Sequence, residues 1–153
     1  MEKGHINPQP HMIGFTDKEG IWRANQLLPD GSERSINTWK DFVTNLTTVA
    51  PLAFGLFGNQ CKNPDAIVEK LKAFYDLGDL NPNEPVTENL AHNLIDVLSD
   101  SMFNYAIDET VKMRAKHQHL QTYYHYFTFS GSHTLANLDL EDRCRQPPLL
   151  ALR

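Results

Sequence analysis

Glu19 stands in the polar turn of residues 11–20 (HMIGFTDKEG), where its position suggests a chemical role. The residues before it, 11–16, form a short and mostly apolar run that is typical of a buried parallel strand. A turn after such a strand presents side chains at the strand's carboxyl end, which is where open α/β sheets bind ligands. By residue type alone, a Glu in a polar turn is most simply a solvated surface residue. The pattern therefore marks Glu19 as a candidate without assigning its role.

Histidine and cysteine side chains are the other groups that could bind a metal ion. His117, His119 and His125 lie close together in the sequence, but no Asp, Glu or Cys joins them at metal-ligand spacing. Cys61 and Cys144 match no metal-binding pattern, and no disulfide between them is predicted. The residue types therefore predict neither a metal site nor a cofactor.

Two further polar residues, Asn45 and Asp100, lie in sequence contexts that indicate a possible modification site and a possible helix cap. Asn45 begins the tripeptide Asn-Leu-Thr, an N-glycosylation sequon within a predicted helix, which matters only if the chain enters the secretory pathway. Asp100 follows Ser99 between two helical patterns, so either residue can cap the second helix. Capping is the expected role of Asp100.

Helical spacing dominates the segments that must position these side chains. The predicted strands are at 11–16 and 121–130. The predicted helices between them are at 21–28, from the cap Ser35 to Pro51, from the cap Asn63 to just before Gly78, from the cap Thr87 to 98, and one that ends near His117. The apolar stretch 51–58 is expected to be a buried connector, the alternative being a ligand-pocket wall. Two strands separated by helices predict a parallel pair with a crossover. Because an isolated pair is marginally stable, this α/β pattern predicts one piece of a larger sheet.

The amino-acid composition of the chain limits which classes of binding partner are expected. The chain has 153 residues, 41% hydrophobic and 22% charged, with a formal net charge of −5, which is ordinary for a globular domain. Without a cluster of Lys and Arg, a nucleic-acid partner is not expected. No apolar run approaches the roughly 20 residues of a membrane-spanning helix. The first residues have no apolar core of a signal peptide, so the localisation is not assigned.

Two segments resemble type-B carboxylesterases, in the group that contains cholinesterases and insect juvenile hormone esterases. Residues 12–20 (MIGFTDKEG) are similar to the strand and Glu-Gly pair that deliver the acid of that family's catalytic triad. Residues 98–108 (LSDSMFNYAID), the following helix and the strand at 123–129 (YYHYFTF) resemble the region that leads to the last catalytic loop. The resemblance covers about residues 10–138. It implies a partial α/β-hydrolase fold, mostly helical, with two parallel strands from the C-terminal half of the sheet.

The resemblance also implies a mechanism and a role for Glu19. In this fold the triad follows the chain order Ser, then Asp or Glu, then His. The Ser attacks the carbonyl of a small carboxylic ester, the His removes its proton, and the acid orients the His. Glu19 matches the acid position. Asp100 would, as an alternative to capping, form hydrogen bonds near the active site of a complete enzyme.

The other two members of the triad do not match. No Gly-x-Ser-x-Gly occurs in the sequence, so the nucleophile is expected to lie upstream of it. The family's Gly-x-x-His is also missing, and the chain continues as a dissimilar stretch at 139–153. His133 has the chain order of a triad base but lacks the flanking residues, and we interpret it as a loop histidine. The predicted organisation is a C-terminal part of a carboxylesterase domain at 1–138 and an irregular tail at 139–153.

Three hypotheses follow from the sequence. The first is a portion of a carboxylic-ester hydrolase that carries only the triad acid and is inactive alone. The second is a non-catalytic, cholinesterase-like binding or adhesion module. The third is an unrelated small helical protein, which would require both family-like segments to be coincidental.

Overall fold

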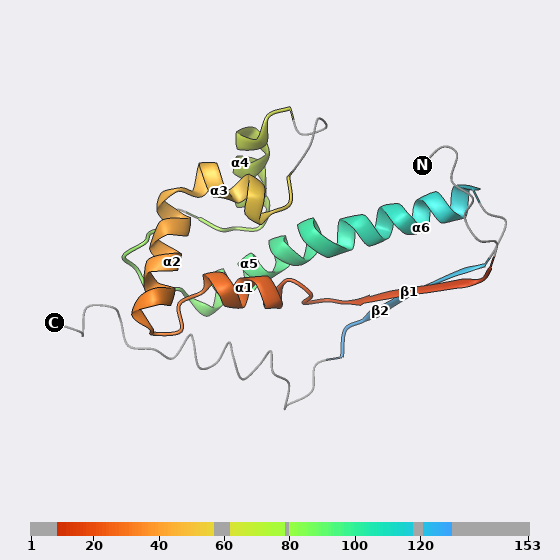
Figure 1. The fold of residues 1–153 in the computed structure, drawn as a ribbon, viewed down its shortest axis with the longest axis horizontal. Coiled ribbons are helices and arrows are strands. Elements are labelled where there is room, and N and C mark those ends of the chain that lie inside the picture. Colours follow the sequence, from red (N-terminus) through yellow and green to blue (C-terminus); the bar gives the residue numbers. More distant parts are fainter. Residues whose placement is uncertain (1–8, 57–61, 79, 118–120, 130–153) are drawn as a thin grey trace.

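The computed structural model describes residues 9–56, 62–78, 80–117 and 121–129 (Figure 1). The elements in chain order are β1 (His11–Thr16), α1 (Ile21–Leu27), α2 (Glu33–Thr44), α3 (Leu46–Ala53), α4 (Pro64–Phe74), α5 (Glu88–Ser99), the π-helix η1 (Asp100–Asn104), α6 (Tyr105–His117) and β2 (Thr122–Phe127). We call α1–α5 the helical body, and β1, β2 and α6 the arm. In Figure 1 the two strands and α6 extend together away from the body.

The two strands form a parallel pair, in register from His11 opposite Thr122 to Thr16 opposite Phe127. The predicted parallel pair and the predominance of helix are confirmed, so the chain has a partial α/β fold. The second strand is shorter than the predicted 121–130. Because the pair is parallel, both carboxyl ends lie at the same edge.

The helical body contains the apolar core. Its buried residues come from α1–α5 and the loops between them, and the helices present them at helical spacing. These residues are Ala24, Leu27, Leu28, Trp39, Phe42, Val43, Leu46, Ala50, Ala53, Phe54, Val68, Leu77, Ala91, Leu94, Ile95, Val97 and Leu98. The turn of Glu19 follows the carboxyl end of β1 and leads into α1, so it connects the arm to the part of the chain that contains the core.

The predicted helix from Ser35 to Pro51 is wrong in its cap, its continuity and its end. Ser32 is the cap, accepting a hydrogen bond from the Ser35 amide, and Asn45 separates α2 from α3. The side chain of Asn45 donates to the Asp41 carbonyl at 3.0 Å, a local bond that competes with the helical ladder. Pro51 lies inside α3, and the helix continues because the amide of Phe54 still reaches the Ala50 carbonyl at 2.8 Å.

The caps of α4 and α5 agree with the sequence pattern. Asn63 accepts a hydrogen bond from the Ala66 amide, with Pro64 at the first helical position, and Thr87 accepts one from Leu90. Gly78 lies beyond the end of α4 with a φ of +61°, a conformation that favours glycine.

The predicted interruption at Ser99 and Asp100 is wrong, as is the expected capping by Asp100. The helix runs from α5 through η1 into α6, with one wide turn in place of a break. Ser99 donates back to the Ile95 carbonyl at 2.7 Å, and Asp100 accepts from side chains of Tyr75 and Asn104. Both side chains are engaged in contacts that do not cap a helix.

The arm has two different faces. Paired residues of a parallel sheet point to the same side, so Phe15 lies with Tyr124 and Tyr126, with ring centroids 5.5 and 4.7 Å away. The opposite side, which we call the uncovered face, carries Met12, Tyr123, His125 and Phe127. Met12 is 74% exposed on that face. Among the described residues, no helix is long and apolar enough to cross a membrane.

Candidate functional site

The turn that follows β1 fixes the side chain of Glu19. Its Oε1 accepts a hydrogen bond from the Thr16 amide at 2.8 Å, which folds the carboxylate back toward the end of the strand. The side chain is half-buried, and Oε2 has no partner within the described ranges. A carboxylate held by one oxygen keeps the other free to accept a further hydrogen bond.

Gly20 closes the turn against the end of α5. It is buried, and its amide donates to the Ser99 Oγ at 2.8 Å. A Cβ added to Gly20 would lie 2.4 Å from the Ser99 amide nitrogen and 2.5 Å from the Ile95 carbonyl oxygen. This close approach of two backbones explains why a glycine follows Glu19.

Two further contacts hold the residues between Thr16 and Glu19. The Asp17 amide donates to the Phe127 carbonyl at 3.2 Å, which extends the strand pairing into the turn. Lys18 forms an ion pair with Asp96 of α5, with the two side chains 37% and 40% exposed. The turn is therefore attached to β2 on one side and to α5 on the other.

The end of β2 lies beside the turn of Glu19. Thr16 and Phe127 are paired, so the chain beyond Phe127 leaves the sheet at the edge where Glu19 stands. A group supplied after β2 would start its path next to this carboxylate. His133, the candidate base that follows β2, lies outside the described residues.

A second polar cluster lies next to the turn, at the start of η1. The Asp100 carboxylate accepts hydrogen bonds from the Tyr75 hydroxyl and from the Asn104 amide, both at 2.6 Å. Partial burial, followed by the hydrogen bond to Asp100, raises the pKa of Tyr75 well above its usual value. The phenol therefore stays protonated and acts as a donor to Asp100 at neutral pH.

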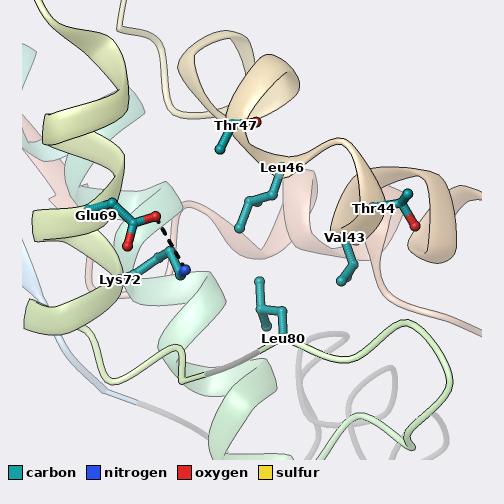
Figure 2. Close-up of a pocket in the computed structure, with 7 residues that line it drawn as sticks. All are labelled: Val43, Thr44, Leu46, Thr47, Glu69, Lys72 and Leu80. Atoms are coloured by element: carbon teal, nitrogen blue, oxygen red, sulfur yellow. Dashed lines mark hydrogen bonds and ion pairs between the residues drawn. The ribbon is translucent and has the colours of Figure 1, made fainter.

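Hollows on the described part of the helical body are lined by residues other than those of the Glu19 turn. In Figure 2 the Glu69 and Lys72 pair of α4 faces Leu46 and Thr47 of α3 across a pocket. The volume of this pocket is about 230 Å³. A larger groove of about 550 Å³ has Leu52 and Ala53 in its wall, so part of the predicted connector at 51–58 does line a hollow. Neither hollow contains the residues of the Glu19 turn.

The remaining candidates are dispersed or fall outside the description. His125 lies on the exposed β2, and His117 ends α6. His119, Cys61 and Cys144 lie outside the described residues. Within the described ranges no three His, Cys, Asp or Glu side chains gather as metal ligands would.

The sequence patterns did not predict the contacts of three residues of this site. Ser99 holds the Gly20 amide, and Tyr75 and Asn104 hold Asp100. The only sequence signal was the Ser-Asp pair at a helical junction, which suggested caps. Tyr75 lies 25 positions from Asp100, and Gly20 lies 79 positions from Ser99, which is beyond the range of any local pattern. Asn104 lies only four positions after Asp100, but neither residue type suggested this contact.

Comparison with known proteins gives one match. The model of the carboxylesterase family matches residues 1–148, a range that includes Glu19, η1 and both strands. No curated protein and no solved structure matched the chain. Because the family match covers nearly the whole sequence, this chain belongs to the carboxylesterase family.

Proposed function

We propose that this chain carries the acid of a Ser-Glu-His triad, Glu19, within an α/β-hydrolase of the cholinesterase and juvenile hormone esterase group that cleaves small carboxylic esters. One observation carries the proposal: the Glu19 carboxylate is half-buried at the carboxyl end of β1, held through Oε1 and open at Oε2. The parallel register adds support, since the chain after β2 leaves at the same edge.

The chemistry assigns a limited task to this chain. In such a triad the serine attacks the ester carbonyl while the histidine accepts its proton. The acid accepts a hydrogen bond from the second ring nitrogen, which sets the tautomer and stabilises the imidazolium that forms. Oε2 of Glu19 would accept that bond while Thr16 keeps the carboxylate from rotating.

The chain by itself is proposed to be inactive. It contains no Gly-x-Ser-x-Gly, and a triad without its nucleophile loses most of its rate. The measurement is hydrolysis of p-nitrophenyl acetate by the purified chain, with a protein-free control. Turnover that disappears in Glu19→Gln but persists in Asp17→Asn would overturn the inactive interpretation.

A chimera tests the role of Glu19 directly. Residues 9–129 would replace the matching segment of an active family member that keeps its own Ser and His. Activity is expected in the chimera and in Asp17→Asn, whose carboxylate lies in the same turn, but not in Glu19→Gln. Equal activity of the two variants would exclude Glu19 as the triad acid.

Asn45 is proposed as a glycosylation acceptor if the chain is secreted. It is exposed between α2 and α3 and lies at the rim of the larger groove, so the fold has room for a sugar there. Secretory expression followed by glycosidase treatment should show a mass shift that Thr47→Ala abolishes. A shift that survives Thr47→Ala would place the modification elsewhere.

The alternative is a non-catalytic binding module. The uncovered face favours it, because a contiguous exposed aromatic surface is typical of a protein–protein contact. Tyr123 and Phe127 are 52% and 46% exposed there. A single sharp thermal transition of the isolated chain would support an independent module, and a broad, aggregating transition would speak for a portion of a larger domain.

A further inference from the structure

A buried serine hydroxyl connects the turn of Glu19 to the helical body. Ser99 is 1% exposed, and its Oγ accepts from the Gly20 amide at 2.8 Å while donating to the Ile95 carbonyl at 2.7 Å. The hydroxyl thus bridges a backbone donor and a backbone acceptor that lie far apart in the sequence. Without it, a buried N–H of the turn would lose its partner.

The hydroxyl lies where the turn and α5 approach most closely. The space around Gly20 leaves no room for a Cβ between the turn and the backbone of Ile95 and Ser99. The other link between these segments, the Lys18 and Asp96 ion pair, is more than one-third exposed and is screened by water. Ser99 is therefore the buried polar link between α5 and the turn.

The position of Ser99 in its helix is also distinctive. It is the last residue of α5, and the π-helical turn η1 begins directly after it. Turns of this kind are frequent at functional sites. A serine that donates to the carbonyl four residues earlier also bends a helix.

We propose that Ser99 is a positioning residue for the Glu19 carboxylate, acting through the Gly20 amide, an inference that rests on the proposed role of Glu19 as triad acid. Gly20 directly follows Glu19, so the orientation of the peptide between them determines where the carboxylate projects. The Thr16 amide then holds Oε1 only if that peptide keeps its orientation. Ser99 touches neither substrate nor histidine in this scheme.

The Thr16 amide provides a direct readout. Its proton is hydrogen-bonded to Glu19, so its chemical shift should change as the carboxylate is protonated. In ¹⁵N-labelled protein, an acid titration of wild type is expected to show this shift, and Ser99→Ala is expected to lose it. A Thr16 shift that titrates in Ser99→Ala as it does in wild type would overturn the proposal.

A matched control separates this effect from general destabilisation. The Ser101 Oγ is also buried but has no hydrogen-bond partner among the described residues, so Ser101→Ala should keep the Thr16 titration. Ser99→Thr retains a hydroxyl and should restore the titration at least in part. Loss of the shift in Ser101→Ala as well would show that the effect is not specific to Ser99.

The titration remains decisive if Ser99→Ala does not fold. Ser99→Cys then takes its place, because a thiol fills similar space but is a weak acceptor and donor. An unchanged Thr16 titration in that variant would overturn the proposal. The two proposals can fail separately. If the chimera stayed active with Glu19→Gln, Glu19 would not be the triad acid, but the Thr16 shift would still depend on Ser99 if Ser99 positions the carboxylate.

Discussion

The helical body and the arm both carry large apolar side chains, but only the body buries them. All seventeen residues of the buried core lie between Ala24 and Leu98, and none of the described residues of β1, β2 or α6 belongs to it. In the arm, Tyr124 and Tyr126 remain 47% and 51% exposed even on the side where they stack with Phe15. A parallel sheet is normally covered on both faces, so the arm has the composition of an interior and the exposure of a surface.

This difference shows which part of the chain can hold its own structure. Burial of apolar area stabilises the body, whereas the two-stranded pair is below the size that is stable alone. We expect that further strands or helices would be needed to cover both faces of the arm. Glu19 and Gly20 lie at the boundary between the two regions, where the body supplies Ser99 and the arm supplies Thr16.

The largest expected effect separates the two regions by stability. Trp39 is 1% exposed, and Trp39→Ala should lower the free energy of unfolding by about 3–5 kcal/mol through the lost burial and the cavity. Tyr123, a large aromatic residue of the arm, is 52% exposed. Tyr123→Ala should therefore change the free energy of unfolding by no more than about 0.5 kcal/mol. Urea unfolding followed by far-UV circular dichroism measures both. Similar losses in the two variants would show that the arm is as well packed as the body.

The next effect concerns the boundary itself. Gly20→Ala places a methyl group against the backbone of Ser99 and Ile95 and should cost about 1–3 kcal/mol. In Gly14→Ala, within β1, the added Cβ would lie 3.2 Å from the nearest atoms of His125, a less severe contact than at Gly20. This substitution should change the free energy of unfolding by less than about 1 kcal/mol. The same unfolding measurement applies. A larger cost at Gly14 would place the tighter contact inside the arm.

A smaller effect tests how much of the body depends on local capping. The Asn63 side chain accepts from the Ala66 amide at 3.1 Å, and Asn63→Ala should cost about 1 kcal/mol. Asn45 precedes α3 in the same way but makes no side-chain cap, so Asn45→Ala should cost only a few tenths of a kcal/mol. Thermal unfolding compares the two. Equal losses would mean that the cap geometry contributes little and that packing alone holds α4.

Sequence patterns predicted several features that depend on near neighbours. The caps Asn63 and Thr87 are set within a few residues, and both are as expected. The strands were recognisable from apolar and β-branched runs, and their parallel pairing from the helices between them. The position of Glu19 at the end of a strand also followed from its local segment.

Two of the missed features, the roles of Ser99 and Asp100, depend on partners far away in the chain. Ser99 is not a cap because its hydroxyl meets Gly20, and Asp100 is not a cap because its carboxylate meets Tyr75. A helical period shows neither these contacts nor the wide turn η1 that follows Ser99. The break at Asn45 was missed because the apolar stripe continues across it while the backbone does not.

The smallest effect compares the two tyrosines whose pKa is raised, Tyr75 in the body and Tyr124 in the arm. Partial burial and then the bond to Asp100 raise the pKa of Tyr75, whereas slight burial and then the charge of Asp108 raise the pKa of Tyr124. An unfolded tyrosine loses its proton near about pH 10. As the pH rises past this value, these tyrosines ionise in the unfolded chain before they ionise in the folded protein. Their contribution to the free energy of unfolding is therefore fully present below about pH 10 and declines as the pH rises further.

Replacing each tyrosine should therefore flatten the alkaline decline in stability, and Tyr75→Phe should flatten it more than Tyr124→Phe. The reason is that the Tyr75 hydroxyl is hydrogen-bonded at 2.6 Å, while the ring of Tyr124 is 47% exposed and its interactions are screened by water. Urea midpoints of wild type and both variants, taken between about pH 8 and about pH 11, measure the slopes. If Tyr124→Phe flattened the alkaline decline more than Tyr75→Phe did, the arm would shield its tyrosine from water better than the body does. That result would require α6 to cover the strands more closely than the exposed rings indicate.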